Sequence, residues 1–433
     1  MAEVSIGRAF TRLAAIAPDA VAVRVPEGPV LTRAELDDAA GRLAARWMRE
    51  GLVRDDVVVV SLPNGVDAVL AAVAAWKAGA TVQPHRPGAP MPGRPALVVD
   101  APPRVPATGT DPSALDPDLA ASSWKVSATS GSTGTPRLVP AGAPARIDPD
   151  RCTPEFMPAA GVQLVAGPLG HTAPFVYAMR GLMSGHELVV LPRFEPECWL
   201  AAAADHGVTW AMVVPAMMAA IQRVLPEPPP SLPALERVLH LGARCPHPVK
   251  RAWIDWLGPD RVWELYAGTE SHGLALVGGS EWLEHPGTVG RPIAGSSFRI
   301  ERDDGSEADV GEVGLVTMRR DDGPWRTQGD LGRLDAEGRL YLADRAADVV
   351  RLDGRVVWPA DVEAEFEAHP LVRAAAVVAR DGVLVAVVET DLAAAELETF
   401  RRRLPAELRP DLVEVTAEPV RDEMGKVRRS RWR

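Results

Sequence analysis

The chain has 433 residues, of which 47% are apolar and 24% charged, and it is long enough for roughly two to four domains with a large core. Its net charge of −11 argues against a nucleic-acid-binding surface, because such surfaces are basic. Three cysteines (Cys152, Cys198 and Cys245) lack metal-ligand spacing, and no apolar run reaches membrane-spanning length or forms a signal-type N-terminus, so we expect a reduced, cytoplasmic protein.

The N-terminal part alternates between helix and strand patterns. Apolar residues at helical spacing predict a helix from Thr32 to Glu50 and an Ala-rich, buried helix from Asp67 to Ala78. Between them, Asp56 to Val60 is typical of a buried strand. Prolines recur from Pro84 to Pro106, which predicts a surface loop that a short strand at 96–99 interrupts. We interpret these helices and strands as core.

The stretch from Ser127 to Val139 reads S-A-T-S-G-S-T-G-T-P-R-L-V. Gly131 and Gly134 allow backbone N–H groups to converge on one point, and the hydroxyl side chains and Arg137 add donors there. Such a loop suits the phosphates of a nucleotide, although it is not a Walker loop, because no G-K-[ST] ends it. An ordinary Ser/Gly-rich loop is the alternative, and the motifs downstream decide between the two.

Four strand-like runs follow, with helical patterns between them, for instance from Ala216 to Val224. The runs are Gln163–Ala166, Leu188–Leu191, Trp210–Val214 and Val238–Leu241. Alternation of strand and helix predicts a parallel sheet that binds ligands at the carboxyl ends of its strands.

The pattern changes twice in the C-terminal half. From about Gly287 to Leu342, short strands alternate with turns, which predicts a small β-rich subdomain. Further on, we expect a helix at Ala360–His369, a hairpin over Ala374–Val388 that turns at Asp381-Gly382, and a charged helix at Ala393–Arg403. This order of elements indicates a separate α+β domain.

Four more motifs follow the glycine-containing loop. They are Tyr266-Ala-Gly-Thr-Glu270, Trp325-Arg-Thr-Gln-Gly-Asp330, Asp344-Arg345 and Gly425-Lys426. The order and spacing of the five segments resemble the adenylate-forming superfamily, which includes acyl-CoA synthetases, luciferases and the adenylation domains of peptide synthetases. The resemblance extends over nearly the whole chain. Compared with most members, this chain is short and its loop comes early, which indicates that elements on the N-terminal side are trimmed.

The resemblance implies an α/β fold in two domains. Residues 1–343 would form a large N-terminal domain with doubly wound parallel sheets and a small β-barrel-like subdomain. Residues 344–433 would form a small, mobile α+β lid. Ala347 occupies the hinge position of the family.

The resemblance also assigns residues to ATP. Tyr266 would stack on the adenine, which Gly242 and Ala243 would wall. Asp330 would accept both ribose hydroxyls, and Thr269 would contact phosphate. The full set is Thr129, Ser130, Gly131, Ser132, Thr133, Gly134, Arg137, Gly242, Ala243, Tyr266, Thr269, Asp330 and Arg345.

Formation of an acyl adenylate brings a carboxylate against a phosphate, so cations must offset their repulsion. Lys426 stands where the family's C-terminal lysine bridges the two anions, and Glu270 matches its magnesium-coordinating glutamate. Arg345 matches an arginine at the domain junction that reaches ribose or phosphate. His171 falls where acyl-CoA synthetases carry a gate near the substrate carboxylate. A solvated tail lysine, a loop glutamate and a hydrogen-bonded histidine are the alternative interpretations.

The acid itself would be apolar. Neither Asp nor Glu occurs between Gly161 and Gly185, where amino-acid-activating domains hold the α-ammonium. The residues implied to contact the acid are His171, Phe175, Gly242 and Gly268. The implied pocket walls run over 171–175, 214–218 and 242–243.

Four positions depart from the family pattern. Arg137 replaces a lysine, which keeps the charge without being equivalent at short range. Gln328 replaces a threonine and Asp344 replaces a glycine. Ala347 replaces the usual Asp or Lys of the hinge, which puts the kinetics of domain alternation in question. The segments around Gln328 and Asp344 look more like synthetases for bulky steroid-like or polyketide acids than like acetate activators.

We therefore predict a two-step ligase that uses ATP and Mg²⁺ to convert a hydrophobic carboxylic acid into an acyl adenylate, and then transfers the acyl group to a thiol. Coenzyme A is the expected thiol, because no carrier segment is appended to the chain. A separate acyl carrier protein is the alternative, since the basic tail from Lys426 to Arg433 would suit an acidic carrier. An alternative of another class is a catalytically silent homologue that binds nucleotide or acyl groups. The identity of the acid and the oligomeric state stay open.

Overall fold

The computed structural model describes residues 3–91, 93–107, 111–128, 137–149, 153–352, 354–427 and 429–433. The chain divides into two compact units. Unit 1 comprises Met1–Val213 and Val224–Val238, and unit 2 comprises Val214–Arg223 and Leu239–Arg433. These units are defined by compactness. The predicted boundary after residue 343 instead separates a mobile lid from the rest of the chain, and it stays a prediction.

Unit 1 is built on two mainly parallel sheets, as the alternating pattern predicts. In the first sheet, β4 pairs in parallel with both β5 and β6. In the second, β10 lies in parallel between β11 and β12, β2 extends the sheet in parallel, and β3 closes this edge antiparallel. The strands are β2 (Val21–Arg24), β3 (Val30–Thr32), β4 (Val57–Val60), β5 (Thr81–Pro84), β6 (Leu97–Val99), β10 (Val162–Val165), β11 (Glu187–Val190) and β12 (Trp210–Val213).

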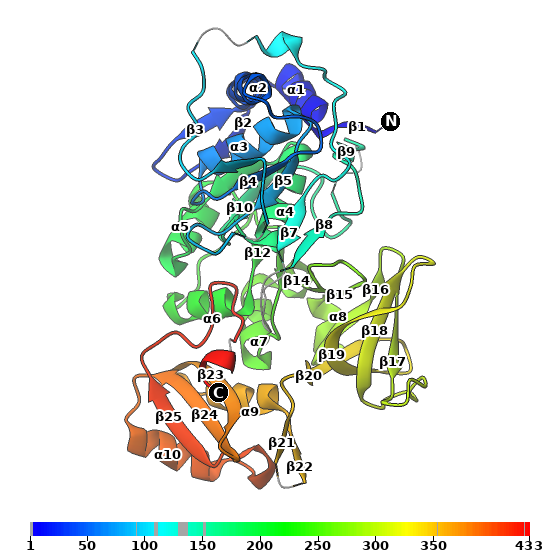
Figure 1. Ribbon diagram of the computed structural model, residues 1–433. Coiled ribbons are helices and arrows are strands. Elements are labelled where there is room, and N and C mark those ends of the chain that lie inside the picture. The colour runs from blue at the N-terminus through cyan, green and yellow to red at the C-terminus, as the bar shows by residue number, and fades with distance from the viewer. Residues whose placement is uncertain are drawn as a thin grey trace. The chain divides into compact units, whose positions relative to one another are not determined.

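The helices of unit 1 confirm the helical patterns of the sequence. Thr32 and Glu35 form a capping box, in which each side chain accepts the other residue's backbone N–H, and this fixes the start of α2. α3 is buried along nearly its whole length, as its alanine content predicts. The helices are α1 (Ile6–Ile16), α2 (Arg33–Arg49), α3 (Val66–Lys77), α4 (Thr172–Met183) and α5 (Pro196–Asp205). Figure 1 shows α1, α2 and α3 grouped beside β4 and β5.

Trp76 is at the centre of an aromatic cluster in the core of unit 1. Its ring centroid lies 6.3 Å from that of Phe10, 6.2 Å from that of Trp124 and 6.0 Å from that of Phe175. The indole N–H donates to the carbonyl of Trp124 at 2.7 Å, so the polar atom of this buried ring is satisfied. Phe175 belongs to α4, and the cluster therefore fixes α4 against α1 and α3.

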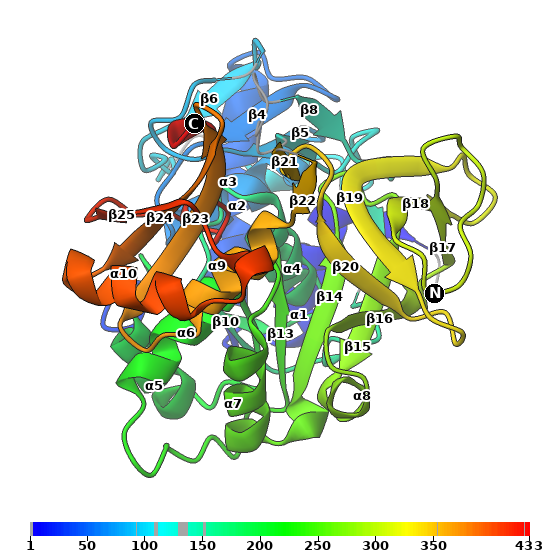
Figure 2. The ribbon, with the colours of Figure 1, turned by 90° about the horizontal axis from the view of Figure 1, so that it is seen from below.

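Unit 2 contains a run of antiparallel strands. The order of neighbours is β14 (Val262–Ala267), β15 (Leu274–Gly278), β16 (Thr288–Ile293), β20 (Leu340–Arg345), β19 (Arg326–Leu334), β18 (Gly314–Arg320) and β17 (Ser296–Glu301). The strand pairing gives this order, and Figure 2 shows β17 and β18 at the end of the run away from β14. They form an open sheet, and the described residues contain no closed barrel, so the expectation of a barrel-like subdomain is corrected here. Each inner strand forms backbone hydrogen bonds with the antiparallel strand on either side, and β17 is the edge strand of the sheet.

The C-terminal part of unit 2 is the α+β module that the sequence predicts. Asp381 and Gly382 have φ of +51° and +80°, which is the conformation of a tight hairpin turn. Its elements are β21 (Val350–Leu352), β22 (Arg355–Val357), α9 (Pro359–Glu367), β23 (Val372–Arg380), β24 (Val383–Thr390), α10 (Ala394–Arg403) and β25 (Leu412–Thr416). Figure 1 shows α9 and α10 beside the sheet β23-β24-β25.

The two faces of the sheet β23-β24-β25 have different covers. Residues such as Ala375 and Val377 pack with α9 and α10 on one face. On the other face, Ala376 and Val378 pack with the C-terminal segment through residues such as Val427. The segment that carries Lys426 is thereby held on this sheet. Among the described residues, no helix is long and apolar enough to cross a membrane.

A buried ion pair joins α7 (His247–Leu257) to β14 in unit 2. Lys250 Nζ lies 2.5 Å from Glu264 Oε2, and the Lys250 side chain is fully buried. Burial by itself would raise the pKa of Glu264, but the Lys250 ammonium overrides it and lowers the pKa. Buried His240 lies 3.8 Å from the same carboxylate, and burial lowers its pKa to about 3, so its ring is neutral.

Replacing Glu264 by Ala should lower the free energy of unfolding by about 3–5 kcal/mol, because it leaves the Lys250 ammonium buried without its partner. Equilibrium urea denaturation measures the change. The matched control is Asp38→Ala, which breaks the exposed ion pair with Arg42 and should cost less than about 1 kcal/mol. Equal effects of the two substitutions would contradict the prediction.

Candidate functional site

Asp330 is the centre of the candidate site in unit 2. Its side chain is 12% exposed, and its carboxylate accepts a hydrogen bond from the Tyr266 hydroxyl at 2.6 Å and lies 3.4 Å from Arg345 Nε. β19 and β20 place Asp330 and Arg345 as opposite residues, and Tyr266 comes from β14. Burial and the Asp330 charge raise the pKa of Tyr266, so the phenol stays protonated and donates. Three predicted ATP-binding residues are thus in direct contact.

Lys426 is presented by a tight turn. The Asp422 carboxylate accepts the backbone N–H groups of Met424 at 2.9 Å and of Lys426 at 3.0 Å. Gly425 has φ of +73°, and a Cβ there would lie 3.3 Å from Ala216 Cβ, so both the backbone conformation and the close approach favour glycine. Our sequence analysis missed Asp422, although an Asp three residues before a Gly-Lys pair signals such a turn.

The surroundings of Lys426 shift the pKa of its ammonium group. Burial and the neighbouring Arg345 lower the pKa of its ammonium, while Asp422, Asp330 and Glu270 act in the opposite direction. Lys426 is therefore within electrostatic reach of Arg345, Asp330 and Glu270. Arg345, 3.4 Å from Asp330, and Lys426, whose charge interacts with both groups, make a site that attracts a further anion.

Glu270 is exposed in the turn that follows β14. The turn is closed by a hydrogen bond from the Ser271 N–H to the Gly268 carbonyl at 3.0 Å. No group of three or more His, Cys, Asp or Glu side chains that would hold a metal occurs in the described part of the chain. A single carboxylate instead fits a magnesium ion that takes its other ligands from phosphates and water.

Gln328, one of the four departures from the family pattern, packs on Gly268. A Cβ added to Gly268 would lie 2.0 Å from Gln328 Oε1, so only glycine leaves room for this amide. Gln328 Nε2 also lies 3.4 Å from the sulfur of Met318. The Gln328 side chain therefore covers one side of the loop that carries Thr269 and Glu270.

The loop after β13 (Arg237–Leu241) carries the residues predicted to wall the adenine. Gly242 has φ of +95°, which turns the chain directly after the strand. The side chain of Arg244, also in this loop, forms an ion pair with Asp361 of α9, with 2.7 Å between Nη1 and Oδ1. Gly242 and Ala243 thus lie in the same unit as Tyr266 and Asp330, and the structure places Arg244 as a link to α9.

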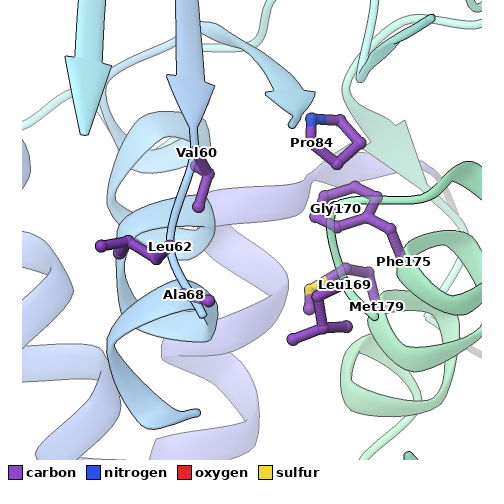
Figure 3. Close-up of a pocket in the computed structure, with 8 residues that line it drawn as sticks. All are labelled: Val60, Leu62, Ala68, Pro84, Leu169, Gly170, Phe175 and Met179. Carbon is purple, nitrogen blue, oxygen red and sulfur yellow. The ribbon is translucent and has the colours of Figure 1, made fainter. Parts of the chain in front are cut away.

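In unit 1, His171 is the N-cap residue of α4, and its N–H donates to the Pro168 carbonyl at 3.0 Å. Phe175, one turn later, lines a small apolar pocket. The lining residues are Val60, Leu62, Ala68, Pro84, Leu169, Gly170, Phe175 and Met179. Figure 3 shows Phe175 and Met179 opposite Val60, Leu62 and Ala68. His171 precedes this helix but does not line the pocket.

The predicted phosphate loop lies largely outside the described residues. This applies to Thr129, Ser130, Gly131, Ser132, Thr133 and Gly134. Its flanks are described, because β7 (Val126–Ala128) pairs antiparallel with β8 (Leu138–Pro140). Arg137 is exposed directly before β8. The loop thus connects the two strands of a hairpin.

Comparison with known proteins adds likenesses in sequence. A model of the family "AMP-binding enzyme" matches residues 10–127 and 96–325, which is most of the chain. The chain is 28% identical to a 2-succinylbenzoate–CoA ligase of Bacillus cereus over 233 residues, which are 50% of this chain and 48% of that relative. The chain thus covers about half the length of this curated relative.

Solved structures resemble the chain over nearly its whole length. The o-succinylbenzoate CoA synthetase of Bacillus subtilis, in complex with its acyl-adenylate intermediate, has a TM-score of 0.79 at 22% identity and covers 100% of this chain and 98% of that one. ATP-bound MatB from Rhodopseudomonas palustris has a TM-score of 0.80 at 23% identity, with 99% and 98% covered. At this level of identity, the likenesses establish the fold.

The lysine side chains provide a direct test of the site's electrostatics. Burial and Arg345 lower the pKa of Lys426 below the ordinary 10.5. As the pH rises, Lys426 should therefore lose its proton before a free lysine does. Burial and Arg180 lower the pKa of Lys125 to about 8. NMR titration of ¹³C-methylated lysines measures both values, and Lys426→Arg assigns the resonance. A Lys426 midpoint at or above 10.5 would contradict this description.

Proposed function

The chain belongs to the AMP-binding enzyme family, and we propose that it activates a hydrophobic carboxylic acid with ATP and then transfers the acyl group to coenzyme A. The observation that carries the proposal is the contact of Asp330 with Tyr266 and Arg345, within electrostatic reach of Lys426. A buried carboxylate that accepts a hydroxyl hydrogen bond on one oxygen has lone pairs left for ribose hydroxyls. The nearby cations suit the phosphate attached to that ribose.

In the first step, an oxygen of the substrate carboxylate attacks the α-phosphorus of ATP. The bond from that phosphorus to the bridging oxygen of pyrophosphate breaks, and pyrophosphate leaves with the bonding electrons. Lys426 and Arg345 would hold the two approaching anions and stabilise the charge of the transition state. Glu270 would contribute one carboxylate oxygen to a magnesium ion on the phosphates, which offsets phosphate charge when it is bound.

In the second step, the thiol loses its proton to water and its sulfur attacks the acyl carbonyl carbon. The bond from that carbon to the oxygen that bridges it to phosphorus then breaks, and AMP leaves with this oxygen, which came from the substrate carboxylate. The predicted division into residues 1–343 and a lid of residues 344–433 belongs to this part of the proposal. Ala347 lies in an exposed turn between β20 and β21, which closes through the N–H of Asp348 and the carbonyl of Arg345 at 2.9 Å. A rotation here needs only a few dihedral changes.

Unit 1 contributes the remaining assignments of the proposal. The loop over residues 129–137 is assigned to the phosphates, and His171 to the substrate carboxylate. Phe175, which the proposal assigns to the acid, is apolar, which agrees with a hydrophobic acid. Cys198 and Cys245 are free thiols, which agrees with a cytoplasmic location, where ATP and coenzyme A are available.

Two alternatives stay open within this proposal. A separate acyl carrier protein could supply the thiol in place of coenzyme A, because the basic C-terminal segment would suit an acidic partner. A silent homologue would bind ATP without turning it over. The contacts of Asp330 and the lowered pKa of Lys426 favour a working site over the silent homologue.

We expect pyrophosphate release that requires ATP, magnesium and a hydrophobic acid, measured across aliphatic, aryl and steroid-like acids with and without coenzyme A. Acyl-CoA as product supports the whole proposal. Adenylate without acyl-CoA redirects it to a carrier protein. ATP binding without pyrophosphate release for any acid of the panel would establish the silent homologue.

Replacing Lys426 by Ala should slow adenylate formation by at least ~100-fold, because it removes one electrostatic contact of the transition state. Transfer of the acyl group from a supplied adenylate to coenzyme A should survive. The two half-reactions are measured separately, as ATP–pyrophosphate exchange and as thioester formation. Arg431→Ala, in the same basic segment but on an exposed side chain, is the control and should leave both rates unchanged. Equal loss of both half-reactions in Lys426→Ala would refute the assigned role.

A further inference from the structure

Asp344, another departure from the family pattern, makes two hydrogen bonds at the end of β20. Its Oδ1 accepts the N–H of Arg345 at 2.8 Å, and its Oδ2 accepts the N–H of Ala360 at 2.8 Å. Ala360 is the second residue of α9, whose first N–H groups have no partner within the helix. The N-cap residue Trp358 supplies no side-chain acceptor. Asp344 therefore caps α9 from a different part of the chain.

The start of α9 has a second anchor. Arg244, in the loop after β13, pairs with Asp361 at 2.7 Å, one residue after the amide that Asp344 holds. Both side chains of this pair are about two-fifths exposed, so water screens the attraction. Asp344 is half-buried, so water screens its contacts less, and negative charge is favourable at a helix N-terminus. Of these two anchors, Asp344 therefore has the stronger hold on α9.

α9 is in turn tied to the segment that carries Lys426. Arg429 donates to both oxygens of Glu363, a buried residue of α9, at 2.7 and 2.9 Å. The same guanidinium donates to Asp348 at 3.0 Å. Any shift of the start of α9 is thus transmitted to the chain three residues beyond Lys426.

The contact spans the turn over residues 346–348. Asp344 precedes this turn and Ala360 follows it, so a rotation of the chain at Ala347 separates the carboxylate from the amide. The bond to the Arg345 N–H lies on the near side of the turn and survives such a rotation. Asp344 thus stabilises one arrangement of the lid relative to Arg345.

We propose that Asp344 is a positioning residue, which docks the start of α9 and so keeps Lys426 within electrostatic reach of Arg345 and Asp330 for adenylate formation. The inference rests on the proposed function and adds to it the control of the lid. It assigns a role to a carboxylate at a position where the family has glycine. Its loss should release the lid toward the arrangement for acyl transfer.

The test compares Asp344→Asn and Asp344→Gly with the unmodified full chain. Glycine removes both acceptor oxygens. Asparagine keeps one oxygen, but its NH₂ group then faces a backbone N–H, so two donors oppose each other and that hydrogen bond is lost. ATP–pyrophosphate exchange should fall roughly 10-fold in Asp344→Gly and less in Asp344→Asn, the scale of losing hydrogen bonds to a charged group. Thioester formation from a supplied adenylate should stay equal or rise. Asp391→Asn, an exposed lid carboxylate paired with Arg373, is the control and should change neither.

Two readouts do not need turnover. Hydrogen exchange of the Ala360 amide should be faster in both variants, and the pKa of Lys426 should move toward that of a free lysine. Unchanged exchange together with an unchanged Lys426 titration would overturn the inference, as would equal loss of both half-reactions. If no acid of the panel supports pyrophosphate release in the unmodified protein, the proposed function fails, and the exchange and titration data still decide the role of Asp344.

Discussion

The site of unit 2 depends on the burial of one carboxylate. Removing a charged group from water is costly unless donors and opposite charges surround it, and Asp330 meets this requirement with the Tyr266 hydroxyl and the Arg345 guanidinium. These partners come from β14 and β20, while Asp330 belongs to β19. The register of β19 with β20 is therefore a condition for the site, because a slip of one residue would point Arg345 away from Asp330.

The same carboxylate explains why cations can gather there. Burial lowers the pKa of Lys426, and repulsion by the Arg345 guanidinium lowers it further. Asp330, Asp422 and Glu270 offset part of the repulsion. A phosphate placed among these groups would replace repulsion by attraction, which is the electrostatic basis of the adenylate chemistry proposed for this unit.

The departures from the family pattern differ in what the structure explains. Gln328 fits because Gly268 has no side chain, and Asp344 fits because the start of α9 has unsatisfied N–H groups. Neither contact can be predicted from the sequence, because the partners are far apart along the chain. Gln328 lies 60 positions after Gly268, and Asp344 lies 16 positions before Ala360. Nothing in the described part of the chain explains why position 137 is arginine or position 347 alanine.

The sequence by itself determined what depends on neighbours along the chain. The helix from Thr32 to Glu50, the parallel strands of unit 1 and the turn at Asp381-Gly382 follow from periodicity, capping and turn chemistry, which act over a few residues. Tertiary structure decided the rest, because it depends on partners that are distant in the chain. The open sheet in place of a barrel-like subdomain is set by strand pairing. Asp344 and Asp422 support Arg345 and Lys426 because their carboxylates accept backbone N–H groups. Only the folded chain shows which N–H groups need such an acceptor.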